Sequence, residues 1–288
     1  MKNSRRRFLD SYLKDVLEGL YAKYNRRELI APDPLQWVYK FNRKADMELA
    51  GFLSAALAYG RVEQINRDLG RVFDITGKRP AEFVGNFSNA DRKRFADFKH
   101  RFTTGEDVAD LFDVFKVMLG KWGSIEKCFA GSGVGGENIL SALGAFCEQV
   151  GQIQRELGRE FHRGLRYLFT SPADGSVCKR MNLFLRWMVR KDDVDAGLWK
   201  SFDKSQLIVP VDVHIARLTK ILGFHSRETT SIKTAIEITA AFAKIEPRDP
   251  VKYDFALSRI GIVEGCTGKP SGYCANCELL IWCKKRAD

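Results

Sequence analysis

Four of the seven cysteines fall within the last 23 residues of the chain, in the spacing C-x7-C-x2-C-x5-C. Thiolates that lie this close in sequence suit either an iron–sulfur cluster or a tetrahedral zinc ion. Zinc sites more often combine two C-x2-C pairs, whereas here one such pair has a single cysteine on each side. The spacing therefore favours a [4Fe–4S] cluster, with zinc as the alternative. The predicted ligands are Cys266, Cys274, Cys277 and Cys283.

Lys179 and Asp212 each stand at the predicted start of a helix. Lys179 opens an apolar-periodic segment, and Asp212 lies between the extended run at 207–211 and another such segment. A lysine amine can act as a nucleophile, and a carboxylate can stabilise a developing positive charge. The alternatives are a surface lysine at a helix start and an aspartate that only caps its helix.

The cysteine loop resembles the end of the endonuclease III branch of the helix-hairpin-helix DNA glycosylases. In those proteins C-x6-C-x2-C-x5-C holds a [4Fe–4S] cluster, and this chain has one more residue in the first gap. The resemblance implies that Lys269, Lys284 and Lys285, in or beside the loop, contact DNA phosphates. A solvated basic C-terminus is the alternative interpretation.

Two further segments are similar to the same superfamily. The run VPVDVH matches a V-D-x-H segment whose aspartate is essential in the family, and this maps onto Asp212. The run SPADGSVCK resembles the hairpin L-P-G-V-G-x-K, which aligns Gly175 with the first glycine and Lys179 with the nucleophilic lysine. Val177 replaces the second glycine. The 33-residue separation of Lys179 and Asp212 is longer than in most relatives and resembles that of the archaeal 8-oxoguanine glycosylases.

The resemblance implies a glycosylase with AP-lyase activity that acts on double-stranded DNA bearing an oxidised base. Lys179 would form the Schiff base and Asp212 would be the essential carboxylate. Arg180 would neighbour the amine and contact DNA, and His214 would hold the Asp212 helix or touch a phosphate. A non-catalytic nucleic-acid-binding protein with the same fold and cluster is the alternative, and a structural zinc protein is a third. The whole chain also resembles a bacterial family of conserved proteins with no assigned function.

The segment ELAGFLSAALA at 48–58 resembles the family helix that ends in a gap-filling Gln or Asn. Ala56 stands at about that position and cannot hydrogen-bond an unpaired base. Tyr59, Arg61 and Gln64 follow closely and are the candidate substitutes, which makes Arg61 and Gln64 predicted DNA contacts.

The net charge of +11 makes a polyanionic partner plausible, because each cation that meets a phosphate releases a counterion. No run of about 18 apolar residues is present to span a membrane, and the basic N-terminus has no apolar signal region. We therefore expect a cytoplasmic protein without a membrane partner, associated with the nucleoid and monomeric. In that compartment clustered cysteines indicate metal rather than disulfides.

Helical periodicity dominates the chain and predicts an all-α, two-lobed fold of the glycosylase type. Residues 1–45 and 210–288 would form the cluster lobe. Residues 46–209 would form a helical barrel with a degenerate hairpin near 171–190, and 46–58 would be a buried central helix. A further helix at 153–167 would place a row of basic side chains on one face. The predicted helices lie at about 6–24, 34–41, 46–58, 62–76, 107–121, 137–156, 179–191, 213–223, 230–244 and 251–261.

Overall fold

The computed structural model describes residues 2–133 and 135–283, and these are mostly helical. The first helices are α1 (Lys2–Tyr24), α2 (Lys44–Ala56), α3 (Val62–Thr76), α4 (Pro80–Gly85), α5 (Asn89–Lys93), α6 (Gly105–Trp122) and α7 (Ile125–Gly131). The later ones are α8 (Leu140–Glu156), α9 (Arg163–Leu168), α10 (Lys179–Val189), α11 (Val213–Ile221), α12 (Ile232–Ile245) and α13 (Asp254–Ile262). The predicted all-α class is confirmed at this level.

Short 3-10 turns connect several of these helices. They lie at Arg27–Leu29, Pro34–Lys40, Pro172–Asp174, Lys204–Gln206, Gly272–Asn276 and Leu280–Trp282. The turn at Pro34–Lys40 begins where the sequence predicts a helix start, because the Asp33 carboxylate accepts a hydrogen bond from the Leu35 amide at 3.0 Å. Within the described residues, one small antiparallel sheet pairs β1 (Lys99–His100) with β2 (Thr103–Thr104).

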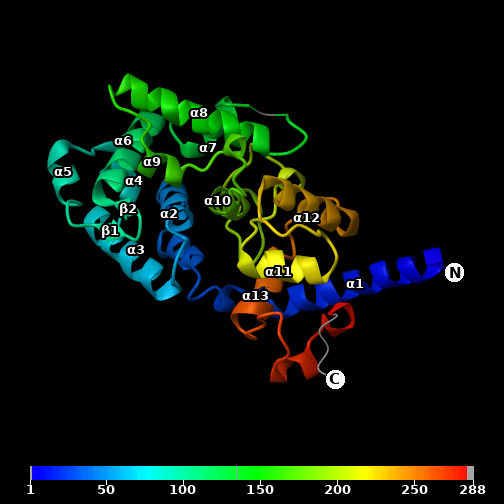
Figure 1. Ribbon diagram of the computed structural model, residues 1–288. Helices are drawn as coiled ribbons and strands as arrows, with labels where there is room; N and C mark the ends of the chain where they lie inside the picture. Colours follow the sequence, from blue (N-terminus) through cyan, green and yellow to red (C-terminus); the bar gives the residue numbers. More distant parts are fainter. Residues whose placement is uncertain (1, 134, 284–288) are drawn as a thin grey trace.

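The helices gather on two sides of the molecule, with α10 between them (Figure 1). Helices α2 to α9 lie on one side, and α1, α11, α12 and α13 lie with the C-terminal segment on the other. Helix α10 packs against α2, and α13 packs against both α1 and α11. Lys179 therefore begins a helix that lies where the two groups meet.

Helix α2 is buried nearly all round, as its sequence predicts. Two acidic side chains on it cap neighbouring helices instead of facing solvent. Asp46 accepts a hydrogen bond from the Ala81 amide at the start of α4, at 2.8 Å. Glu48 accepts from the amides of Ile125 and Glu126 at the start of α7. Buried carboxylates are tolerated here because each one satisfies backbone N–H groups that have no partner inside their own helix.

The predicted helix at 153–167 is wrong. Helix α8 ends at Glu156, the chain turns through Gly158 with φ of 69°, and α9 begins only at Arg163. The side chain of His162 caps α9, and Arg159 forms ion pairs with Asp110 and Asp113 on α6. The expected row of basic side chains on one helix face is therefore absent from this described segment.

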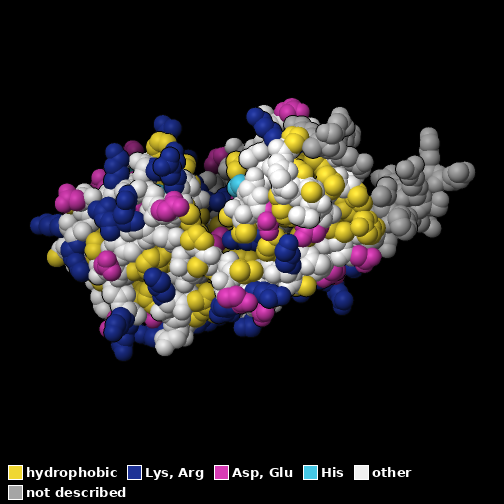
Figure 2. All heavy atoms as spheres, turned by 90° about the horizontal axis from the view of Figure 1, so that it is seen from below, with side chains coloured by type: hydrophobic (Ala, Val, Ile, Leu, Met, Phe, Trp, Pro, Cys, Tyr) yellow, Lys and Arg dark blue, Asp and Glu magenta, His cyan; other side chains and the backbone are white. Residues whose placement is uncertain are grey.

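Figure 2 shows that Lys and Arg side chains are spread over the half of this face that carries α2 to α9. Hydrophobic side chains gather on the other half. None of the described helices is long and apolar enough to cross a membrane.

Candidate functional site

Lys179 is the first residue of α10, and its side chain is half-buried. Its Nζ atom donates a hydrogen bond to the carbonyl oxygen of Ala58 at 3.1 Å. Ala58 lies just beyond the end of α2, so the amine is held at the point where α10 and α2 meet. The positive end of the helix dipole lies at the N-terminus and disfavours a cation there. A lysine at this position is therefore unusual unless it has a functional role.

Asp212 is the N-cap of α11, as the capping interpretation predicts. Its Oδ1 atom accepts hydrogen bonds from the amides of His214 and Ile215, both at 2.8 Å. The capping role does not use the whole carboxylate. Among the residues that the structure describes, nothing donates to Oδ2, which leaves this oxygen for a second role.

His214 lies in the first turn of α11, two residues after Asp212. Burial lowers the pKa of its imidazole, and the negative charge of Asp212 partly offsets that effect. The positive charges of Arg217, Arg259 and Lys179 lower the His214 pKa further. Two residues 33 positions apart in sequence therefore influence a single ring, which is neutral at neutral pH.

The ring of His214 packs directly against α13. A Cβ atom added at Gly261 would lie 2.2 Å from His214 Nδ1 and 2.9 Å from its Cβ, so no larger residue fits there without movement. Arg217 donates one hydrogen bond to His214 Nδ1 at 3.0 Å and another to the carbonyl of Cys266. Arg217 thereby links the imidazole to the start of the cysteine loop. Sequence reasoning missed this residue, although it lies one helical turn after His214.

Buried ion pairs between arginine and aspartate side chains hold the long segment between Lys179 and Asp212 in place. Arg186 on α10 donates to Asp195 at 3.2 Å and also pairs with Asp254 at the start of α13. Arg190 pairs with Asp195 and Asp249, each at 3.0 Å. These ion pairs fix α10 relative to α13, which carries the glycine that receives His214.

Asp254 belongs to this network of ion pairs, and the negative charge of Asp212 affects its pKa. Burial raises the pKa of the Asp254 carboxyl to about 7, against the lowering effect of Arg186, and the Asp212 charge raises it further. Arg186 is therefore the counterion of both Asp195 and Asp254. Asp212 adds a third carboxyl group whose charge acts on Asp254.

The predicted hairpin differs in detail from its family counterpart. Gly175 is exposed and has φ of 70°, a left-handed conformation that favours glycine. Val177, which replaces the second glycine, is not left-handed, but Cys178 has φ of 51° instead. The amide of Cys178 donates to Ser176 Oγ at 3.2 Å. That N–H group is therefore already used inside the hairpin and is not offered to a phosphate.

Arg180 does not occupy the position expected of a DNA-binding residue. Only 7% of it is exposed, and its guanidinium donates to the carbonyls of Ala56 and Tyr167. The guanidinium is thus already used inside the protein, and contact of Arg180 with DNA stays a prediction. By donating to the carbonyl of Ala56, Arg180 links the end of α2 to the start of α10.

Arg61 and Gln64 lie at the start of α3. Arg61 is the exposed N-cap residue, and no hydrogen bond or ion pair from its side chain is found in the described part of the chain. Gln64 is half-buried and donates to Asp68 at 2.5 Å. Arg61 is thus available to an external partner, whereas Gln64 would first have to leave Asp68.

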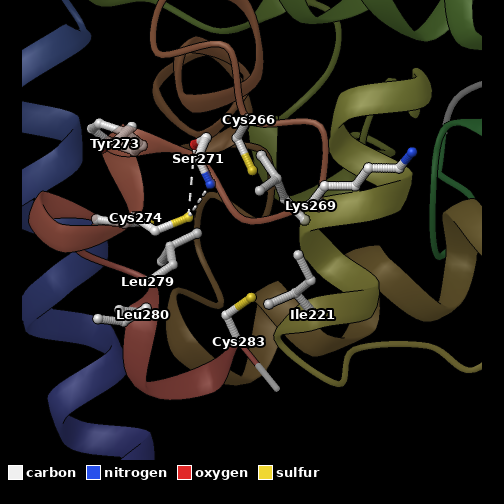
Figure 3. Close-up of a pocket in the computed structure, with 12 residues that line it drawn as sticks. Ile221, Cys266, Lys269, Ser271, Tyr273, Cys274, Leu279, Leu280 and Cys283 are labelled. Atoms are coloured by element: carbon white, nitrogen blue, oxygen red, sulfur yellow. Dashed lines mark hydrogen bonds between the residues drawn. The ribbon is translucent and has the colours of Figure 1, made fainter. Parts of the chain in front are cut away.

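The four C-terminal cysteines line one cavity, together with Leu218, Ile221, Gly268, Lys269, Ser271, Tyr273, Leu279 and Leu280. Figure 3 shows the sulfur atoms of Cys266, Cys274 and Cys283 directed toward a common space beside Leu279 and Ile221. The Ser271 amide donates to the sulfur of Cys274 at 3.3 Å. Burial raises the pKa of the Cys277 thiol, and the neighbouring Cys266 and Cys274 raise it further.

The donor types suit a thiolate-bound cofactor, because four cysteines line one largely apolar cavity. In residues 2–133 and 135–283, however, no three His, Cys, Asp or Glu side chains converge closely enough to hold a metal ion as they stand. Lys269 is exposed beside the cavity. Lys284 and Lys285, also predicted to contact DNA, lie outside the described residues.

A family model matches most of the chain. The model of a family described as "Protein of unknown function (DUF2400)" matches residues 33–263. The matched range includes Lys179, Asp212 and His214, and it ends before the first cysteine of the C-terminal loop. No curated protein and no solved structure matches the chain. Since the match covers more than half of its length, the chain belongs to the family of proteins of unknown function DUF2400.

Proposed function

We propose that this protein is a base-excision DNA glycosylase with AP-lyase activity. The observation that carries the proposal is that Lys179 begins α10, while Asp212 caps α11 with one carboxylate oxygen and keeps the other unengaged among the described residues. A lysine amine and an aspartate carboxylate are the pair of groups that this chemistry needs. The resemblance of both segments to the helix-hairpin-helix glycosylases supports the same assignment.

In the proposed reaction, a damaged nucleotide is rotated out of the duplex toward Lys179. The Lys179 ammonium first loses a proton to solvent. The amine then attacks C1′ of the deoxyribose while the bond from C1′ to the base breaks, and the base leaves with a second proton from the attacking nitrogen. Opening of the sugar ring gives a Schiff base between Lys179 and C1′. Loss of a proton from C2′ then expels the 3′ phosphate and nicks the strand.

Asp212 stabilises the positive charge that develops on the sugar as the base departs. Its Oδ1 atom is committed to the α11 amides, so Oδ2 is the oxygen that would face the sugar. His214 is neutral and therefore does not compete as a second cation for the Asp212 charge. It acts as a positioning residue between α11 and α13.

The cysteine loop supports this function without taking part in the bond changes. Cys266, Cys274, Cys277 and Cys283 would hold a [4Fe–4S] cluster, with zinc as the alternative. When bound, such a group would fix the loop, and Lys269 would then present its charge to the DNA backbone. The net charge of +11 favours the same partner, double-stranded DNA.

The proposed substrate is an oxidised base. The long separation of Lys179 and Asp212 resembles that of the archaeal 8-oxoguanine enzymes, which makes 8-oxoguanine the first candidate. The cysteine loop resembles that of endonuclease III, which makes oxidised pyrimidines the second.

Borohydride trapping on DNA that carries an abasic site tests the proposal. The wild-type protein should form a covalent adduct, and Lys179→Ala should reduce trapping by about 100-fold or more, because the amine is the reacting atom. Asp212→Asn should slow base release by about 100-fold while leaving DNA binding intact. Lys233→Ala, an exposed lysine on α12, is the matched control and should trap like wild type.

Two results would overturn the assignment. Absence of an adduct from wild-type protein that still binds DNA would favour the non-catalytic nucleic-acid-binding alternative. Trapping by Lys179→Ala at the wild-type level would mean that another amine reacts.

A further inference from the structure

Three aromatic rings form a partly exposed patch near Lys179. Phe102 is 68% exposed, Tyr167 on α9 is 36% exposed, and Tyr59 follows the end of α2. The Phe102 and Tyr59 rings are nearly parallel, at 3° and 6.4 Å between centroids. Tyr167 meets Tyr59 edge-on at 5.1 Å and Phe102 at 6.2 Å. We call this set the aromatic patch.

Phe102 lies above a hydrogen-bonded support. It lies at the tip of the β1–β2 hairpin beside Arg101, whose φ of 52° is strained for a residue other than glycine. Below the tip, the fully buried His100 hydrogen-bonds to Asp68 at 2.7 Å and to the Tyr59 carbonyl at 3.0 Å. Tyr59 donates its hydroxyl to the His100 carbonyl at 2.9 Å. The fold holds an apolar ring in solvent at a position where a polar side chain would fit equally well.

The aromatic patch is joined to the segment that holds Lys179. Lys179 donates to the carbonyl of Ala58, the residue before Tyr59. The buried guanidinium of Arg180 lies 4.1 Å from the Tyr167 ring centroid and 5.1 Å from that of Tyr59. Arg101 lies against Gly60 and over the Phe102 ring at 5.4 Å. The patch therefore combines aromatic faces with positive charge.

Aromatic faces flanked by cations are a physical match for unpaired nucleobases. Every base has a π-face that stacks on an aromatic ring, and the adjacent phosphates are attracted by the cations. A fully paired duplex keeps its bases stacked on one another and gives such a patch little to bind. A protein partner would also cover apolar surface, but it would not by itself require the positive charges.

We propose that the aromatic patch of Tyr59, Phe102 and Tyr167 binds an unpaired nucleobase by stacking, with Phe102 as its main contact. This deepens the proposed function, on which it rests for the choice of nucleic acid as partner. It assigns to the β1–β2 hairpin a recognition role for a base that has left the duplex or lost its pairing partner.

Fluorescence anisotropy with three labelled DNAs of equal length tests this inference. They are a paired duplex, the same duplex with one bulged base, and a single strand. Wild-type protein should bind the bulged duplex and the single strand more tightly than the paired duplex. Phe102→Ala should weaken binding to the bulged duplex by about tenfold and should leave binding to the paired duplex unchanged. Phe102→Trp should retain the preference, because it keeps an aromatic face.

Ile236→Ala is the matched control, since Ile236 is an exposed apolar residue on α12 and is 40% exposed. It should behave as wild type. Equal binding of paired and bulged DNA by wild type, or an unchanged preference in Phe102→Ala, would overturn the inference. Either result can occur while Lys179 still traps abasic DNA, and loss of trapping can occur while the preference for unpaired bases persists. The two proposals therefore fail separately.

Discussion

At the scale of single residues, Lys179 lies in the first turn of α10, and Asp212 and His214 lie at the start of α11. Asp212 caps α11 with one oxygen, and Lys179 reaches the carbonyl at the end of α2. His214 lies within the electrostatic influence of both. The capping and catalytic interpretations of Asp212 are thus compatible, because they use different oxygens of one carboxylate.

The pKa of His214 gives a direct test of this arrangement. Asp212→Asn removes a negative charge and should lower the His214 pKa further below its ordinary value. Lys179→Met removes a positive charge and should raise it. An NMR titration of the His214 ring proton, assigned by comparison with His214→Asn, measures both changes.

The direction of the two changes is what matters. Because Lys179 and Asp212 carry opposite charges, their substitutions must move the His214 pKa in opposite directions. Titration curves that superimpose on wild type in both variants would mean that the three side chains do not share a site in solution.

The sequence predicts which residues belong to the candidate site only where they fall in a recognisable motif, and it does not predict which side chains are buried or exposed around them. Lys179, Asp212 and the four cysteines stood out because their spacing resembles known motifs. Arg180 has the same charge as a phosphate-binding residue, and only tertiary structure shows that it is buried beneath two tyrosines. Phe102 carries no sequence signal, because an exposed phenylalanine and a core phenylalanine look the same in a chain rich in aromatic residues.

At the scale of elements, periodicity located the long helices well. Helices α2, α3, α6 and α10 begin and end within about two residues of the predicted bounds. The error at 153–167 has a local cause, because polar residues there keep a helical spacing while Gly158 takes a left-handed turn. Helices α4 and α5 and the β1–β2 hairpin are too short to show a period, so the sequence did not reveal them.

The contact between α11 and α13 depends on the absence of a side chain at Gly261. Gly261→Ala should lower the free energy of unfolding by about 1–3 kcal/mol, because the new Cβ would overlap the His214 ring. Urea unfolding followed by circular dichroism measures the change. Base release should slow as well, since the displaced His214 lies beside Asp212.

Gly120→Ala provides the comparison. Gly120 lies within α6 and a Cβ there would meet nothing within 4 Å. The same exchange should raise stability by about 0.5–1 kcal/mol through helix propensity alone. If Gly261→Ala stabilised the protein as Gly120→Ala does, the close packing of α11 on α13 would be refuted.

At the scale of the whole molecule, buried ion pairs and the cysteine loop join parts of the chain that are distant in sequence. Arg190 connects α10 to the residues before α13, and its Nη2 atom donates to Tyr21 on α1 at 3.1 Å. Tyr12 of α1 stacks on Trp282 of the cysteine loop at 5.7 Å. Lys23 of α1 pairs with Glu278 of that loop at 2.9 Å. The loop is therefore attached to the N-terminal helix as well as to α11.

Metal content tests the assignment of the cysteine loop. Protein purified without oxygen should be brown and should contain about four iron atoms per chain. Cys277→Ala should lose the colour and the iron, whereas Cys128→Ala should keep both, because Cys128 is buried in α7 away from the loop. If the wild-type protein were colourless and contained one zinc ion per chain, the [4Fe–4S] assignment would be wrong and the zinc alternative would be correct.

The central claim is that Lys179 is the nucleophile, and peptide mapping of the borohydride-trapped adduct tests it most directly. Wild-type protein is trapped on abasic DNA, digested with protease and nuclease, and the residual sugar mass is located by mass spectrometry. The account predicts that the modification lies on the side chain of Lys179 alone. A modification on another lysine or on the N-terminal amine, with Lys179 unmodified, would contradict it.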